Sequence, residues 1–468
     1  MADFTNTLYT VLGASTMVKK NFLTLFLAML MILMIAAPAA LAYEPAPEVV
    51  AQRVFMGEPA SGEIIYEKNP DEQATPASLT KVMTALIVLE EADMGDIAVV
   101  NQSALDGLHP ESSIADLKVG EEMSVENLLK CVLIASANDA CNVLAEHLYG
   151  SIDKFVDRMN ERAEELGCEN THFVNTHGLT EDGHHSTARD MYKITLEALT
   201  HPEFLEICNT ARVEIPATNK NDAKVFLSTN YLISALKNPD YVYYYAKGIK
   251  TGHTSAAGYC LISSAEKDDV FYLLVVMGSE RDEETGRIGS FDDSKALYEW
   301  AFANYKYQTL LQKNTPVSEL PVSLSSEVDY VTLVPDRAID ALLPNDFKPE
   351  EVELDVTLDS PDGVQAPVAR GQKLGSAEVT WRGRSYGTVE LVALGEAKLD
   401  KTLEMQKNVG DFFSQKWVIW ILVGIGAVIL LYIIFVIALN VKRRRRRMSS
   451  SNYRGSRRRR SSNHRPGR

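Results

Sequence analysis

The sequence predicts a mixed α/β domain, with a sheet covered by helices, followed by a small all-β domain and one membrane-spanning helix. Three observations lead to this prediction. Helical and strand patterns alternate up to about residue 312, short β-rich runs replace them up to residue 395, and an uncharged run of 25 residues extends from Trp417 to Val441. A chain of 468 residues, 46% of them hydrophobic, is long enough for more than one buried core.

The first 42 residues have the pattern of an export signal. Lys19 and Lys20 precede the apolar run NFLTLFLAMLMILMIAAPA, and the small residues of ALAYEP follow it. This order of a basic, an apolar and a small-residue region predicts cleavage after Ala42. An uncleaved membrane anchor is the alternative, and Met17 is an alternative start to Met1.

Residues 43–312 alternate between helical and strand patterns. SVENLLKCVLIASANDACNVLAEHLYG predicts two helices separated by a break and ended by Gly150, and SIDKFVDRMNERAEELG predicts an amphipathic helix. GYCLISSAEKDDVFYLLVVMG predicts a β-hairpin with EKDD at its turn. The second strand of this hairpin is almost continuously apolar, so we expect it to be buried on both faces.

The remaining segments change in character. Residues 313–395 contain short β-like runs separated by Pro, Gly, Asp and Asn, which predicts a small β-rich domain, and residues 396–416 form a linker. Residues 417–441 are long enough to span a bilayer. The tail, residues 442–468, carries 13 Lys and Arg and no acid, which places it in the cytoplasm and residues 43–416 outside.

Charge and cysteine content exclude some classes of function. The formal net charge is -16 although the tail is strongly basic, so the rest of the chain is acidic and we expect no nucleic-acid binding there. We interpret the tail's arginines as a topology and lipid-surface device, with a nucleic-acid contact as the alternative. The five cysteines show no metal-ligand spacing, and we expect small buried side chains, with a disulfide still open.

The stretch TPASLTKVMTALIVLEE carries the first chemical signal. Thr75 and Pro76 are typical of a helix start, and Ser78 and Lys81 then fall one turn apart at the mouth of an apolar helix. A Ser hydroxyl needs a base to become a nucleophile, and a buried Lys with a lowered pKa can be that base. The spacing alone is weak evidence, because a capped surface turn would look the same.

Two further stretches strengthen the hypothesis. IASANDACN places Ser136 and Asn138 in the break between the two apolar helices, where polar side chains can project into a cleft. GIKTGHTSAAGY places Lys250 beside Thr251 and Gly252, at the start of a β-rich segment. Lys250 can hold a carboxylate or act as a second cation that keeps Lys81 neutral, and Gly permits close approach of a ligand. Each stretch also has a purely structural explanation.

Ser-x-x-Lys, Ser-x-Asn and Lys-Thr-Gly in this order resemble the signature of penicillin-binding proteins and serine β-lactamases. The chain is most similar to the low-molecular-weight penicillin-binding proteins that act as D-alanyl-D-alanine carboxypeptidases. The stretches TPASLTKVMTA, ASANDACNVLAEH, FVNTHGLTEDGHHSTARDM and GIKTGHTSAAGYCLISSA carry the resemblance. It covers residues 45–310, more weakly the β-rich domain, and implies a mostly antiparallel sheet of the β-lactamase/transpeptidase type.

The resemblance implies a role for each motif residue. Ser78 would attack the carbonyl between the last two D-alanines, and Lys81 would take its proton. Ser136 would relay a proton to the departing D-alanine and later from the attacking water. Asn138 would hydrogen-bond the substrate's backbone and steady Lys81.

The third motif would recognise the substrate. The resemblance implies that Lys250, Thr251 and Thr254 bind the terminal carboxylate, with Gly252 in the same substrate-binding stretch. The backbone N–H groups of Ser78 and His253 would form the oxyanion hole. No cofactor and no metal are implied, and the spacing of His177, His184 and His185 fits no zinc pattern.

The resemblance therefore predicts a serine D-alanyl-D-alanine carboxypeptidase acting outside the cell on peptidoglycan stem peptides that end in D-Ala-D-Ala. β-Lactam antibiotics would be its inhibitors, and membrane lipid would surround its single span. A β-lactamase and a non-catalytic penicillin-binding scaffold are the alternatives. The chain lacks a Glu-x-x-Leu-Asn segment, which disfavours a β-lactamase, and its complete set of motif residues disfavours a scaffold. The balance of carboxypeptidase, endopeptidase and transpeptidase activity stays open.

Overall fold

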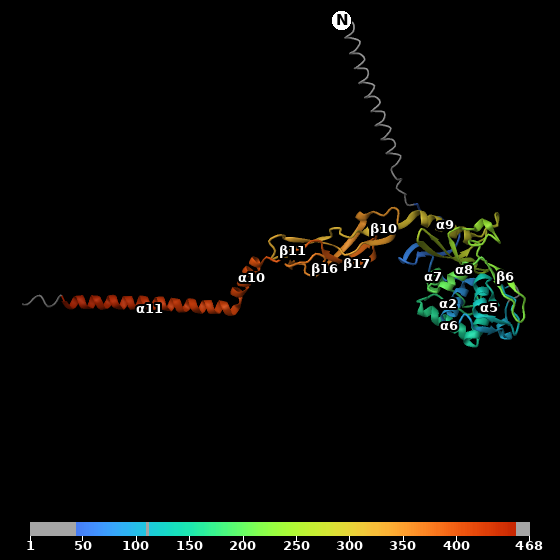
Figure 1. The fold of residues 1–468 in the computed structure, drawn as a ribbon, viewed down its shortest axis with the longest axis horizontal. Helices are drawn as coiled ribbons and strands as arrows, with labels where there is room; N and C mark the ends of the chain where they lie inside the picture. Colours follow the sequence, from blue (N-terminus) through green and yellow to red (C-terminus); the bar gives the residue numbers. More distant parts are fainter. Residues whose placement is uncertain (1–43, 109–111, 455–468) are drawn as a thin grey trace, which may run out of the picture. The chain divides into compact units, whose positions relative to one another are not determined.

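The computed structural model describes residues 44–108 and 112–454, with side chains up to residue 445. The predicted signal peptide and residues 455–468 of the basic tail lie outside this part of the chain. The described residues divide into two units, shown in Figure 1. Unit 1 contains residues 44–308 and 341–348, and unit 2 contains residues 309–340 and 349–454.

Unit 1 is built on a five-stranded sheet in the order β2-β1-β9-β8-β7. All four pairings in this sheet are antiparallel. Its strands are β1 (Arg53–Glu58), β2 (Glu63–Lys68), β7 (Ala246–Thr254), β8 (Gly258–Lys267) and β9 (Val270–Ser279). The predicted hairpin is confirmed as β8 and β9, with Asp268 and Asp269 between them.

Helices cover both faces of this sheet. Alternate residues of β9 face opposite cores: Leu273 and Val275 pack with the larger group of helices, whereas Leu274 and Val276 pack against α9. This explains the continuous apolar run, because both faces of β9 are buried. Figure 1 shows α2, α5 and α6 grouped together, with α9 apart from them.

The helices of unit 1 follow the expected patterns and stop signals. The two predicted helices around the Ser-x-Asn break are confirmed as α4 and α5, and α5 ends at Gly150 in the left-handed conformation. The helices are η1 (Ala77–Thr80), α2 (Lys81–Glu91), α3 (Gln102–Leu105), α4 (Val125–Ile134), α5 (Asn138–Tyr149), α6 (Ile152–Glu165), α7 (Ala188–Ala198), α8 (Pro202–Cys208), η2 (Pro239–Tyr241) and α9 (Gly289–Asn304).

Three two-stranded sheets lie outside the main sheets. They pair β3 (Ile97–Val99) with β4 (Glu122–Ser124), β5 (Arg212–Ile215) with β6 (Lys224–Leu227), and β10 (Tyr305–Leu311) with β13 (Ile339–Pro344). The first two belong to unit 1, and residues of the β5–β6 hairpin contact the loop between β3 and β4.

Unit 2 contains a six-stranded sheet in the order β14-β16-β17-β12-β11-β15. Its elements are β11 (Ser318–Ser323), β12 (Tyr330–Pro335), η3 (Pro349–Glu351), β14 (Val352–Leu358), β15 (Val364–Gln365), β16 (Lys373–Trp381) and β17 (Arg384–Ala393). Two helices follow, α10 (Lys401–Ser414) and α11 (Lys416–Arg454). The predicted fold class, an α/β domain with a β-rich unit and one long apolar helix, is confirmed.

Candidate active site

Ser78 and Lys81 lie side by side where β7 meets the start of α2. Lys81 Nζ is 2.9 Å from Ser78 Oγ and 2.7 Å from the backbone carbonyl oxygen of His177. The expected helix start is wrong in one respect: Ser78 lies in the 3₁₀ turn η1, Pro76 takes the N-cap position, and no side chain caps it. A 3₁₀ turn aligns residues three apart, which brings the amine directly to the hydroxyl.

Burial changes the proton affinity of Lys81. Its side chain is completely buried, and this desolvation lowers its pKa to about 8, while the nearby Cys141 and Asp139 act in the opposite direction. An amine with this pKa is partly neutral near pH 7 to 8, so Lys81 can accept a proton from Ser78.

Ser136 and Asn138 occupy the tight turn between α4 and α5. Ser136 has a left-handed backbone with φ of 63°, an uncommon conformation for a residue other than Gly. Asn138 is the first residue of α5, and its backbone N–H donates to the carbonyl of Ser113 at 2.8 Å. Both side chains are almost fully buried.

Lys250 lies on β7 and reaches the Ser-x-Asn turn. Its Nζ donates to Ser136 Oγ at 3.0 Å and to the carbonyl of Thr251 at 2.9 Å. The side chain is 1% exposed, and its burial together with the charge of Lys81 lowers the pKa of Lys250 to about 7. The two lysines therefore form a coupled pair of buried amines.

The rest of the Lys-Thr-Gly stretch forms the end of the edge strand β7. A Cβ on Gly252 would lie 3.1 Å from the backbone nitrogen of Ser78, a tight contact, so Gly favours this close approach of β7. His253 is exposed, and its ring centroid lies 4.2 Å from that of Tyr259. Thr254 Oγ1 accepts from the N–H of Ala257 at 3.1 Å.

Two threonines that the sequence reasoning missed contact this stretch. Thr251 Oγ1 donates to Thr229 Oγ1 at 2.6 Å, and Thr254 Oγ1 lies 3.0 Å from Thr180 Oγ1. Neither partner has a spacing that a sequence pattern could detect, because both come from loops far away in the chain. They orient hydroxyls of the predicted substrate-binding residues.

The segment from Asn175 to His185 packs over the start of α2. A Cβ on Gly178 would lie 1.8 Å from the carbonyl oxygen of Ala77, and its φ of 89° also requires Gly. The sequence stretch THGLT was part of the resemblance, but the carbonyl of His177 as a partner of Lys81 could not be predicted from it.

His177 and His184 of this segment are buried inside the fold. His184 Nε2 lies 2.8 Å from Thr80 Oγ1, and its Nδ1 accepts from the N–H of Val174. Burial lowers the pKa of His184 to about 4 and of His177 to about 3. Within the described residues, no group of three or more His, Cys, Asp or Glu side chains is arranged to hold a metal ion.

All five cysteines are free and buried. Burial raises the pKa of each thiol: Cys131, Cys141, Cys168, Cys208 and Cys260. The expectation of small buried side chains is confirmed, and no disulfide joins them. Cys141 lies near both lysines, but its raised pKa keeps it protonated at neutral pH.

The geometry brings all three motifs to one place. Hydrogen bonds join Ser78 to Lys81 and Lys250 to Ser136, and the close contact of Gly252 sets β7 against the backbone of Ser78. Ser78 lies beside the partly neutral amine of Lys81, and Ser136 lies beside the amine of Lys250. This arrangement can support nucleophilic attack and two proton transfers.

Comparisons with known proteins identify related chains. A family model described as D-alanyl-D-alanine carboxypeptidase matches residues 40–281, and a model described as the C-terminal domain of penicillin-binding protein 5 matches residues 305–398. The D-alanyl-D-alanine carboxypeptidase DacF of Bacillus subtilis is 32% identical over 78% of this chain and 91% of that protein. DacC of Escherichia coli is 31% identical over 82% of this chain and 92% of that protein.

Solved structures agree with these sequence matches. The crystal structure of penicillin-binding protein 5 from Haemophilus influenzae covers 76% of this chain and 99% of its own, with 30% identity and a TM-score of 0.56. Penicillin-binding protein 6B from Escherichia coli has the same TM-score at 27% identity, over 75% of this chain and 98% of its own.

Proposed function

The chain belongs to the D-alanyl-D-alanine carboxypeptidase family of low-molecular-weight penicillin-binding proteins, and we propose that Ser78 is the nucleophile of its reaction. The enzyme is a serine-type D,D-carboxypeptidase that acts on D-Ala-D-Ala ends of peptidoglycan stem peptides and binds penicillin. The 2.9 Å hydrogen bond between Lys81 Nζ and Ser78 Oγ is the observation that carries the assignment of Ser78. The β-lactamase and scaffold alternatives are not favoured.

Acylation begins with a proton transfer from Ser78 Oγ to the neutral amine of Lys81. The oxygen attacks the carbonyl carbon of the penultimate D-alanine, and the backbone N–H groups of Ser78 and His253 stabilise the oxyanion. The C–N bond then breaks. The proton held by Lys81 reaches the leaving amine through the hydroxyl of Ser136, which leaves an ester on Ser78.

Deacylation uses the same groups in reverse order. Water occupies the place of the leaving amine, gives its proton to Lys81 through Ser136, and attacks the ester carbon. The ester bond breaks, the proton returns to Ser78 Oγ, and the shortened stem peptide is released.

Substrate recognition depends on the carboxylate of the terminal D-alanine. Thr251 and Thr254 bind it through their hydroxyls, the hydroxyl of Thr251 turning from Thr229 to the carboxylate, and the charge of Lys250 attracts it. The buried position of Lys250 on Ser136 supports a second role, in which its ammonium favours proton transfer through that hydroxyl. Asn138 binds the peptide backbone of the substrate.

The C-terminal helices attach the enzyme to the membrane. Residues 416–445 of α11 are long and apolar enough, by length and composition, to span a bilayer. In our proposal this is a single span with the basic tail in the cytoplasm and the catalytic unit outside. Trp417 and Trp420 are exposed at its start, where indole rings suit the interface.

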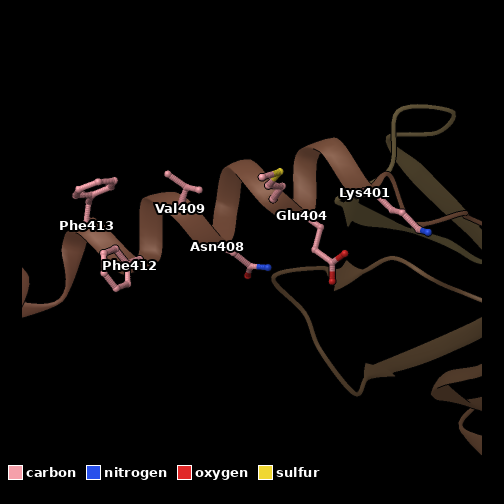
Figure 2. A pocket seen from close by; sticks show the side chains of 7 residues that line it. Lys401, Glu404, Asn408, Val409, Phe412 and Phe413 are labelled. Carbon is pink, nitrogen blue, oxygen red and sulfur yellow. The ribbon is translucent and has the colours of Figure 1, made fainter.

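Helix α10 supports the same placement. Figure 2 shows Val409 and Phe413 on one side of α10, with Glu404 and Asn408 on the other. Phe413 is 52% exposed, and only Gln415 separates α10 from α11. An apolar helix face directly before a span lies at the headgroup level of the outer leaflet.

One experiment tests the activity directly. The full-length protein in detergent is incubated with a stem pentapeptide ending in D-Ala-D-Ala, and the products are measured by mass spectrometry. We expect loss of one D-alanine from the peptide and no loss with Ser78→Ala. Undiminished hydrolysis by Ser78→Ala would refute the assignment of the nucleophile.

A further inference from the structure

The segment Ser112–Leu117 is fastened to the Ser-x-Asn turn by one buried carboxylate. Both oxygens of Asp139 accept from the N–H of Ala115, at 2.8 and 3.0 Å, and one of them also accepts from the N–H of Leu117 at 3.1 Å. Asp139 is 1% exposed. A buried carboxylate with this many backbone donors fixes the donors in place.

The same segment completes the first turn of α5. The N-cap residue Ala137 has no side-chain cap, so the N–H of Asn138 donates instead to the carbonyl of Ser113, and Asp139 accepts from the N–H of Ala140 at 2.9 Å. The position of Asn138 therefore depends on where the segment lies.

The β5–β6 hairpin holds the segment from its other side. Lys224 Nζ donates to the carbonyls of Ala115 at 2.7 Å and Asp116 at 2.8 Å, and Asn221 also donates to the carbonyl of Asp116. Between these hydrogen-bonded residues, Ile114 is 46% exposed. The segment is thus a fixed wall beside Ser136 and Asn138.

We propose that Asp139 is a positioning residue of the reaction: it fixes the Ser112–Leu117 wall and, through it, Asn138 and the left-handed Ser136. The inference rests on the proposed roles of Ser136 and Asn138. Asp139 is also an anion close to the amine of Lys81. The titratable groups that interact with it are Lys81 of α2, Cys131 of α4 and Cys141 of α5, and Lys224 of β6 and Glu121 before β4 act on Cys131.

The chain offers a matched control. Asp293 of α9 is also a buried carboxylate with a pKa raised by burial, and it accepts from the N–H groups of Val50 at 3.0 Å and Ala51 at 2.8 Å. It contacts no motif residue. Asp293→Asn therefore measures what the loss of such a buried charge costs in stability alone.

The experiment compares Asp139→Asn, Asp293→Asn and the wild type as full-length proteins. We expect similar decreases in melting temperature, but a further fall of about 10- to 100-fold in kcat/KM only for Asp139→Asn, because small displacements of reacting groups have effects of this size. We also expect the alkaline limb of its pH profile to move to lower pH, because Asp139 raises the pKa of Lys81 in the wild type and the variant lacks this effect. Equal falls for both variants with an unshifted alkaline limb would overturn the inference.

A second variant covers the case in which Asp139→Asn does not fold. Lys224→Met removes the two hydrogen bonds from Lys224 to the segment, keeps the one from Asn221, and leaves Asp139 in place. We expect a lower acylation rate with penicillin at an unchanged melting temperature, and an unchanged rate would overturn the inference. Labelling of Ser78 in the wild type and in Asp293→Asn checks the proposed function separately.

Discussion

The ammonium of Lys250 donates a hydrogen bond to the hydroxyl of Ser136 at 3.0 Å, although the two residues are 114 positions apart. This contact joins the second motif to the third. The 2.9 Å contact between Lys81 and Ser78 completes the first motif in the same place. Two hydroxyl–amine pairs thus lie together in a buried site, and this arrangement leads to the predictions below.

Ser78 is expected to be the acylated residue. Its hydroxyl contacts a buried amine of lowered pKa, so it is the activated nucleophile. The full-length protein is labelled with a fluorescent penicillin, digested, and the adduct is located by mass spectrometry. The control Ser61→Ala changes an exposed serine of the β1–β2 turn and keeps full labelling. An adduct on any other residue would contradict the assignment.

Lys250→Gln is expected to distinguish carboxylate recognition from proton transfer. Loss of a charge-assisted contact costs about 1.5–3 kcal/mol. This corresponds to a decrease of about 10- to 150-fold in kcat/KM on a peptide ending in D-Ala-D-Ala. The same peptide with an amidated terminus lacks the carboxylate charge, so the further decrease there should be smaller and should measure the effect through Ser136.

Circular dichroism of the Lys250→Gln variant is the control for folding. Equal decreases on the acid and the amide would remove Lys250 from carboxylate recognition. Its role would then be limited to Ser136 and to the pKa of Lys81.

The pH profile of kcat/KM is expected to be bell-shaped, with its maximum between about pH 7 and pH 8. Burial lowers the pKa of Lys81 to about 8, and burial together with the charge of Lys81 lowers the pKa of Lys250 to about 7. The reaction needs a neutral Lys81 as base and a charged Lys250 beside Ser136. Because Lys81 has the higher pKa, this is the less populated form of the singly protonated pair, and its population is greatest between the two pKa values. A profile that is flat from pH 6 to 9 would contradict this account.

His184→Ala is expected to lower the stability of the fold and to make that stability less sensitive to acid pH. At pH 7.5 the variant leaves Thr80 Oγ1 and the N–H of Val174 without this partner, which costs about 1–3 kcal/mol. Because the folded state lowers the pKa of His184 to about 4, this stability is complete above about pH 6.5 and is lost as the pH falls toward 4. Calorimetric melting at pH 7.5 and pH 5 should therefore show a smaller acid shift for the variant.

The half-buried His185 provides the control for this measurement. Its Nδ1 lies 2.8 Å from the carbonyl oxygen of Gly183, and its charge contributes only part of the lowering of the pKa of His184, so His185→Ala should keep most of the wild-type acid shift. If His184→Ala keeps it as well, the buried ring does not contribute to acid sensitivity.

The C-terminus is expected to lie in the cytoplasm. The apolar helix of residues 416–445 precedes a block of arginines, and such blocks stay on the inner side of the membrane. A C-terminal epitope should survive protease treatment of intact wall-stripped cells and disappear after lysis. Degradation before lysis would reverse the orientation.

The sequence predicted the elements whose signals are local. The β8–β9 hairpin, the helices on both sides of Ser136 and the apolar helix α11 each follow from periodicity, turn residues and length. The predicted start of α2 is wrong in detail. Thr75-Pro76 resembles a helical cap, whereas Ala77 and Ser78 lie in a 3₁₀ turn, against which Gly178 and Gly252 pack.

Long-range partners could not be predicted in the same way. Thr229, Thr180 and the carbonyl of His177 reach the motif residues from distant loops, and a backbone carbonyl has no sequence signature at all. The sequence identifies Asp139 only as the residue after Asn138. Its attachment to Ala115 and Leu117 depends on how two loops fold together.

The close approach of Gly252 to the backbone of Ser78 has an evolutionary consequence. If the N–H groups of Ser78 and His253 stabilise the oxyanion, a side-chain exchange at either position leaves the donor in place unless the new residue is proline. Point mutations therefore have few ways to weaken this part of penicillin binding. A larger residue at Gly252 would crowd the backbone of Ser78, so a substitution that weakens the drug's contact there also disturbs the enzyme's own reaction.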